Sequence, residues 1–139
     1  MHFFVAGNPQ GKARPRVVRG HAFTPQKTRD YERGIALAFK AAALREDFKL
    51  LTGAVEIDII AHFSVPVSYS KKRRTACLQG CEHPTKKPDC DNIEKAVCDS
   101  LNGFAYHDDA QIVRSSITKT YSETPGLHIY ITEFTPQVA

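Results

Sequence analysis

Residues 55–64 alternate between two sets of side chains, and this alternation is the strongest constraint on the fold. The apolar set is Val55, Ile57, Ile59, Ala61 and Phe63. The residues between them are Glu56, Asp58, Ile60, His62 and Ser64. Successive residues of a β-strand point to opposite faces of a sheet. The pattern therefore predicts a strand with one buried face, which Pro66 ends.

Shorter patterns predict three further elements before this strand. Residues 2–6 are apolar and favour a short buried strand. Residues 7–26 are rich in Gly, Pro and basic side chains, which favours a loop or a loose hairpin. A helix is expected from Thr28 or Asp30 to about Arg45, over an alanine-rich segment with helical periodicity.

The second half of the chain predicts one main helix and two strands. Asp91 is expected to be the N-cap of the helix, with Glu94 as the acid of a capping box. Strands are expected over about 110–121 and 127–134, the second after a Pro-Gly turn. The order β-α-β-α-β-β predicts a single α+β domain (1–139) with a small mixed sheet of about four strands and two main helices.

The net charge of +4 is unevenly distributed along the chain. Residues 1–29 carry six basic side chains and no acid, and residues 71–87 carry six against the single acid Glu82. The second run lies in a polar segment, 68–87, which is long for a compact domain; we expect it to be functional or mobile, with a short helix at 70–78. Basic segments around an acidic centre suit an enzyme that holds a polyanion, and solvated loops are the plain alternative. The candidate phosphate-binding residues are Arg14, Arg16, Lys71, Lys72, Arg73, Arg74, Lys86 and Lys87.

The four cysteines are Cys77, Cys81, Cys90 and Cys98, and their spacing matches no standard zinc site. Cys98 occupies an apolar position of the expected helix, so we expect it in the core. The expectation is therefore reduced thiols and no zinc, with a zinc-stabilised module as the alternative that a metal assay would test. No apolar run approaches the roughly 20 residues of a membrane helix, which favours a cytoplasmic protein that does not engage a membrane.

Asp89, Asp91, Asp108 and Asp109 form an acidic cluster with the lysine Lys95. Asp89 and Asp91 would lie on one side of an extended segment, roughly 6.5 Å apart, with Lys95 one helical turn later. Asp108 and Asp109 enter the next strand, where neighbours point to opposite faces, so only one of the two is expected to join the others. Crowded carboxylates usually hold a cation, and oxygen ligands favour Mg²⁺. A helix cap, a surface ion pair and a turn are the structural alternatives for the same residues.

Residues 86–113 resemble the signature of the RusA family of Holliday junction resolvases. The resemblance rests on Asp-Cys-Asp-Asn-Ile-Glu-Lys at 89–95 and Asp-Asp-Ala-Gln at 108–111, and more weakly on Gly-Lys-Ala-Arg-Pro-Arg at 11–16. Members of this family are Mg²⁺-dependent homodimeric endonucleases, usually from phages or prophages. The resemblance implies metal ligands at Asp89, Asp91 and Asp109, an essential lysine at Lys95, and supporting positions behind the ligands at Asp108 and Asn92.

The function that this resemblance implies is the cleavage of a four-way DNA junction by paired symmetric nicks, in DNA recombination and repair. Mg²⁺, or Mn²⁺ as a substitute, would activate water and polarise the phosphate. Lys95 would stabilise the negative charge that builds there. Two alternatives remain open: a DNA-binding protein without catalytic activity, and a general nuclease for flaps and replication forks.

Overall fold

A computed structural model describes residues 1–136, which form an α+β fold with a four-stranded mixed sheet. The strands of this sheet are β1 (His2–Ala6), β4 (Val55–Phe63), β5 (Ile112–Tyr121) and β6 (Gly126–Glu133). A separate hairpin consists of β2 (Arg16–Val18) and β3 (His21–Phe23). The helices are α1 (Gln26–Glu46), α2 (Lys71–Leu78) and α3 (Cys90–Ser100), with a short 3₁₀ turn, η1 (Asp109–Gln111). The predicted fold class is confirmed.

The sheet has the order β1-β6-β4-β5, with the predicted strand β4 in its interior. β4 pairs antiparallel with β6 and parallel with β5, and β6 also pairs antiparallel with β1. A parallel pair needs a long crossover connection. Here the crossover runs from the end of β4 through α2, α3 and η1 to β5. The candidate site residues Asp89, Asp91, Lys95, Asp108 and Asp109 therefore all lie in this crossover connection.

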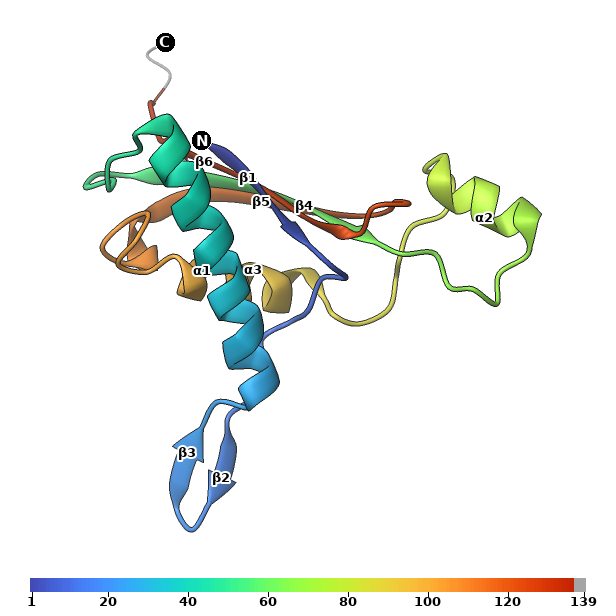
Figure 1. Ribbon diagram of the computed structural model, residues 1–139, viewed down its shortest axis with the longest axis horizontal. Coiled ribbons are helices and arrows are strands. Elements are labelled where there is room, and N and C mark those ends of the chain that lie inside the picture. Colours follow the sequence, from blue (N-terminus) through green and yellow to red (C-terminus); the bar gives the residue numbers. More distant parts are fainter. Residues whose placement is uncertain (137–139) are drawn as a thin grey trace.

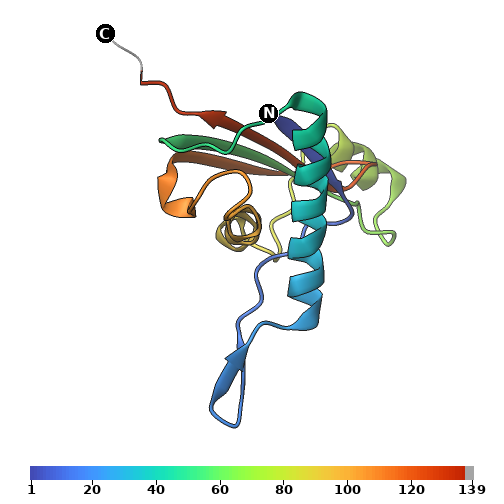
Figure 2. The same cartoon turned by 60° about the vertical axis from the view of Figure 1, so that its left-hand side comes forward.

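The core lies between one face of the sheet and the two long helices, α1 and α3 (Figure 1). Ile57 and Ile59 of β4 are buried there, as the alternation predicts. Ile35 of α1 and Ile93 of α3 are fully buried against them. Both helices lie on the same side of the sheet, and α2 stands apart at its end (Figure 2). Because α3 packs on the sheet through its apolar face, its polar face is exposed to solvent.

Three predicted boundaries differ from the structure. α1 begins at Gln26 rather than at Thr28 or Asp30, because Pro25 holds the extended backbone of an N-cap and the helix follows it directly. α3 begins two residues earlier than predicted, with Asp89 rather than Asp91 as its N-cap. β5 begins at Ile112 rather than at about 110, because the preceding residues form η1. None of the helices in the described part of the chain has the length and apolar character needed to cross a bilayer.

Candidate active site

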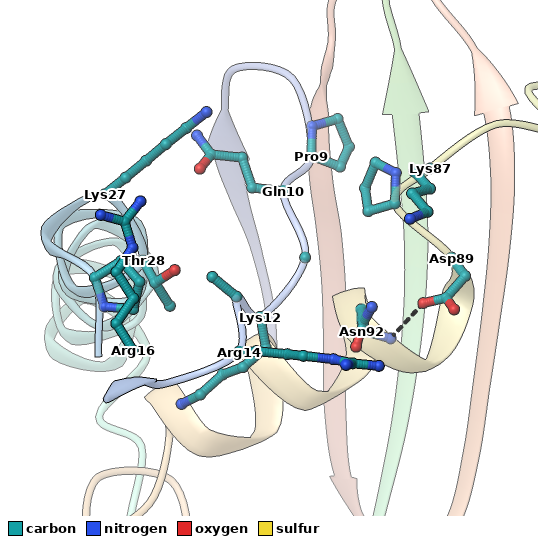
Figure 3. Close-up of a pocket in the computed structure, with 14 residues that line it drawn as sticks. Pro9, Gln10, Lys12, Arg14, Arg16, Lys27, Thr28, Lys87, Asp89 and Asn92 are labelled. Carbon is teal, nitrogen blue, oxygen red and sulfur yellow. Dashed lines mark hydrogen bonds between the residues drawn. The ribbon is translucent and has the colours of Figure 1, made fainter. Parts of the chain in front are cut away.

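The first turn of α3 is organised by Asp89. Its Oδ1 accepts a hydrogen bond of 3.0 Å from the backbone N–H of Asn92, which makes it the N-cap (Figure 3). The prediction that Asp91 caps this helix, with Glu94 completing a capping box, is wrong. Asp91 lies instead inside the first turn, where a negative charge is favoured by the free N–H groups of the helix start. The two aspartates are therefore not an extended pair.

Asp91, Lys95 and Asp109 line one open cavity of about 340 Å³ beside α3. Asp91 and Lys95 are four residues apart, so they lie on the same side of the helix, and Asp109 reaches the cavity from η1. The remaining lining residues are Glu94, Cys98, Ile112 and Ser115, which the sequence did not single out as site residues. The cavity thus gathers two of the three predicted metal ligands and the predicted essential lysine.

The turn around η1 decides which of the two adjacent aspartates faces the cavity. The Asp108 side chain accepts a hydrogen bond from Ala110 N at 3.1 Å and forms a capping box with Gln111. Gln111 fastens the turn to the segment before β4, because its Nε2 donates to Leu51 O at 2.9 Å and Gly53 O at 3.0 Å. Asp108 is therefore engaged in holding the turn, and Asp109 is the aspartate that lines the cavity.

Electrostatics in the cavity favour a cation. Burial raises the pKa of the Asp109 carboxyl, and the neighbouring carboxylates of Asp108 and Asp99 raise it further. Burial, with the charges of Glu94 and Asp109, likewise raises the pKa of the Cys98 thiol to about 12, so this thiol stays protonated. The predicted core position of Cys98 is confirmed, since its side chain is buried. A bound cation would relieve the repulsion between these carboxylates.

Asp89 lines a second, larger cavity of about 590 Å³ on the other side of the start of α3 (Figure 3). This cavity lies between the segment 9–16, the start of α1 and the residues before α3. Its cationic side chains are Lys12, Arg14, Arg16, Lys27 and Lys87. Lys27 was missed as a candidate, although its place beside Phe-Thr-Pro at 23–25 was a usable signal. This basic cavity thus lies next to the cavity lined by Asp91 and Asp109, which is the acidic cavity.

The carboxylates fit a magnesium site of a particular kind. In residues 1–136 no three His, Cys, Asp or Glu side chains are arranged to enclose a metal ion. Mg²⁺ does not require such a cage, because it commonly uses one or two protein carboxylates and completes its shell with water and substrate phosphate. Asp91 and Asp109 in one cavity match that requirement. Asp89 lines a different cavity, and the metal-ligand roles of Asp89, Asp91 and Asp109 all stay predictions.

The basic segment around α2 is ordered by contacts among its own side chains. Ser70 caps α2 by accepting a hydrogen bond from Arg73 N at 3.2 Å. The Arg73 guanidinium pairs with Glu82, with Nη2 at 2.6 Å from Oε1, and stacks 3.6 Å from the centre of the Tyr69 ring. The expected short helix is confirmed over Lys71–Leu78. The expected mobility of 68–87 stays a prediction.

Comparison with known proteins covers nearly the whole chain. Residues 6–132 match the family described as endodeoxyribonuclease RusA. The chain is also 36% identical over 137 residues to the uncharacterized protein YqaN of Bacillus subtilis (strain 168), a match that covers 94% of each chain. The family match includes every residue that lines the two cavities.

Proposed function

The chain belongs to the RusA family of endodeoxyribonucleases, and on that premise we propose that it resolves four-way DNA junctions with the help of a divalent metal. The observation that carries this proposal is the shared cavity of Asp91, Lys95 and Asp109 beside a basic cavity. Carboxylates to hold a metal and cations to hold a polyanion are the two requirements of metal-assisted phosphodiester hydrolysis. Holliday junction resolution in DNA recombination and repair is the role proposed for that chemistry.

Asp91 and Asp109 are the proposed holders of Mg²⁺, with Asp89 as a further ligand and Mn²⁺ as a substitute. The metal would supply a water of lowered pKa and would polarise the scissile phosphate. Asp108 keeps Asp109 in place through η1. Asn92 does the same for Asp89, because its N–H occupies one oxygen of that carboxylate.

Lys95 is the proposed stabiliser of the transition state. Its side chain is exposed in the acidic cavity and has no ion-pair partner within residues 1–136. An ammonium that is not neutralised inside the protein is free to contact the phosphate oxygens as their negative charge increases. The position of Lys95 one turn after Asp91 keeps the two groups on one side of α3.

The basic cavity is the proposed path of the DNA backbone. Arg14, Arg16 and Lys87, with the additional Lys27, line it next to Asp89. Lys71, Lys72, Arg74 and Lys86 extend the basic surface toward α2, whereas the Arg73 charge is already paired with Glu82. Contacts of this kind hold backbone phosphates and recognise shape rather than sequence.

The dependence of DNA affinity on salt concentration tests whether the DNA backbone follows the basic cavity. If about six phosphates are neutralised, the slope of log affinity against log salt is expected to be near −5. Arg14→Gln should make that slope less steep by about 1, because one phosphate contact is lost. Arg73→Gln should change it less, because Glu82 already neutralises this guanidinium. Fluorescence anisotropy with a labelled junction in EDTA measures both; equal changes for the two variants would contradict the assignment.

The substrate and the assembly are tested by one cleavage experiment. The wild-type chain with Mg²⁺ is incubated with a four-way junction, a replication fork and a linear duplex of matched length at equal salt. The proposal expects paired symmetric nicks in the junction, made by a homodimer whose two-fold axis matches that of the DNA. Tight binding without cleavage would favour the non-catalytic DNA-binding alternative, and equal cleavage of the fork would favour a general branched-DNA nuclease.

The proposed setting is the cytoplasm of a bacterial or phage-infected cell, where junctions form during recombination. The family match supports the nuclease class of this proposal. The metal, the dimer and the phage origin are further parts of the proposal.

A further inference from the structure

Lys12 joins two helices that are far apart in the sequence. Its Nζ lies 2.6 Å from Glu32 Oε1 of α1 and 3.0 Å from Asp99 Oδ2 of α3. The side chains of Lys12 and Glu32 are each 21% exposed and that of Asp99 is 26% exposed, so the ion pairs are screened less than surface pairs. Burial lowers the pKa of Lys12, but the hydrogen bonds to Glu32 and Asp99 outweigh it and leave the pKa raised. Lys12 is therefore a charged residue with its charge already satisfied.

This pairing separates Lys12 from its basic neighbours. Arg14 and Arg16 belong to the same segment and line the same cavity, yet neither forms an ion pair with the described residues. Their charges are available to a polyanion, whereas two carboxylates already use the charge of Lys12. Lys12, Arg14 and Arg16 are similar cations in the sequence. In the structure only the charge of Lys12 is paired with carboxylates.

The backbone around Lys12 is in close contact with the start of α3. The N–H of Lys12 donates a 3.1 Å hydrogen bond to the carbonyl oxygen of Asn92. A Cβ added at Gly11 would lie 2.9 Å from Asn92 Cβ and 3.0 Å from Pro88 Cβ, so glycine is required for this approach. The segment 11–16 is thus docked directly on the turn of α3 that contains Asp89 and Asp91.

Asp99 connects the ion pairs of Lys12 to the acidic cavity. It follows Asp91 by eight residues and Lys95 by four, so the three side chains follow one side of α3. The Asp99 carboxylate is also close enough to Asp109 to affect that carboxyl electrostatically. Asp99 therefore has an ammonium on one side and a candidate metal ligand on the other.

We propose that Lys12 is a positioning residue, which ties Glu32 of α1 to Asp99 of α3 and so fixes the DNA-binding segment 11–16 against the helix of the acidic cavity. Without this ammonium, the carboxylates of Glu32 and Asp99 lose the cation they share and repel each other. Segment 11–16 then keeps only its backbone contact with the start of α3, through Gly11 and the Lys12 N–H. DNA held by Arg14 and Arg16 loses its alignment with the cavity, and misplacement by about 1 Å can cost about 100-fold in rate.

The test compares Lys12→Met with Arg14→Met, which removes a cation from the same segment, and with the conservative Lys12→Arg. The reasoning rests on the proposed nuclease function, so one readout is independent of cleavage: amide hydrogen exchange of residues 11–13 and of the start of α3. The other readouts are junction affinity in EDTA and the single-turnover cleavage rate at saturating protein with Mg²⁺.

Lys12→Met is expected to lower the saturating cleavage rate by at least about tenfold and to accelerate exchange at the Lys12 amide, with junction affinity changed less than about threefold. Lys12→Arg should restore both the rate and the slow exchange. Arg14→Met should weaken binding without changing exchange at the Lys12 amide.

Two results would overturn the proposal. One is a Lys12→Met variant that loses affinity as Arg14→Met does, with unchanged exchange and saturating rate, since Lys12 would then be an ordinary phosphate contact. The other is exchange accelerated equally throughout the central strand β4, which would indicate general destabilisation. If the wild-type chain cleaves no junction, the nuclease proposal fails, and the exchange comparison still decides whether Lys12 fastens the segment.

Discussion

Replacing Asp109 with asparagine is expected to reduce junction cleavage by roughly 10³-fold while making the metal-free protein slightly more stable. The loss of rate follows because one of the two proposed metal-holding carboxylates can no longer hold the metal or balance its charge. The stability change has the opposite sign because burial and the carboxylates of Asp108 and Asp99 oppose ionisation of Asp109. A variant of this kind separates function from stability.

The direction of the stability change follows from proton linkage. The raised pKa means that the folded state binds a proton at Asp109 more tightly than the unfolded state does. The ionised carboxylate therefore costs stability as pH rises past the unfolded value near 4, and the cost is complete above the folded pKa. Asparagine removes that cost at neutral pH. Asp109 is only half-buried, so the gain should not exceed about 1 kcal/mol.

Thermal unfolding in EDTA and in Mg²⁺, together with a cleavage assay, checks both parts of this prediction. The wild-type melting temperature should rise with Mg²⁺ as ligand binding to the folded state requires, and that of Asp109→Asn should respond much less. Asp108→Asn is the matched comparison, because it removes one negative charge from the adjacent residue but keeps an oxygen for the N–H of Ala110. A cleavage loss as large in Asp108→Asn as in Asp109→Asn would contradict the assignment.

Tyr106→Ala is expected to give the largest loss of stability, about 3–5 kcal/mol. The side chain is fully buried, and its hydroxyl donates a 2.6 Å hydrogen bond to Cys98 O near the end of α3. Removing the ring leaves a cavity between α3 and the segment that leads to η1. The loss should therefore also displace Asp109, which follows three residues later.

Urea unfolding, with Tyr106→Phe as the control, checks this second prediction. The phenylalanine keeps the packing and loses only the hydrogen bond, so its cost should be near 1 kcal/mol. Equal costs for the two variants would show that the hydrogen bond, rather than the buried ring, accounts for the effect. Unchanged stability in both would contradict the core assignment of Tyr106.

Local patterns in the sequence predicted the elements that depend on local physics. The alternation at 55–63 gives β4 with its observed bounds, because burial on one face of a sheet imposes a period of two. The end of α1 and the existence of α3 follow from helical periodicity in the same way. The α+β class then follows from the order of these elements.

The N-cap of α3 could not be chosen locally, because Asp89 and Asp91 are both good capping residues. The choice depends on the path of the chain into α3, where Gly11 packs on Pro88 and the Lys12 N–H bonds Asn92 O. These contacts join residues about 80 positions apart, and no local pattern reports them. The two ion pairs of Lys12 could not be predicted from the sequence for the same reason.

The sequence contains a signal for the 3₁₀ turn before β5, but the turn was not predicted from it. Asp108 and Gln111 have the spacing of a capping box, acid first and glutamine three residues later. That spacing identifies Asp108 as a cap, which leaves Asp109 for the cavity. The sequence pattern alone treated both residues as part of a strand, and only the family resemblance preferred Asp109.

The position of β1 makes formation of the sheet depend on β6, which is synthesised more than a hundred residues later. β1 pairs only with β6, so that His2 lies opposite Tyr130. While the chain is being made, Phe3 and Val5 have no sheet to join, and one edge of β4 also lacks its β6 partner. Exposed edges of this kind pair with other chains. A chain interrupted before Gly126 should therefore aggregate rather than fold.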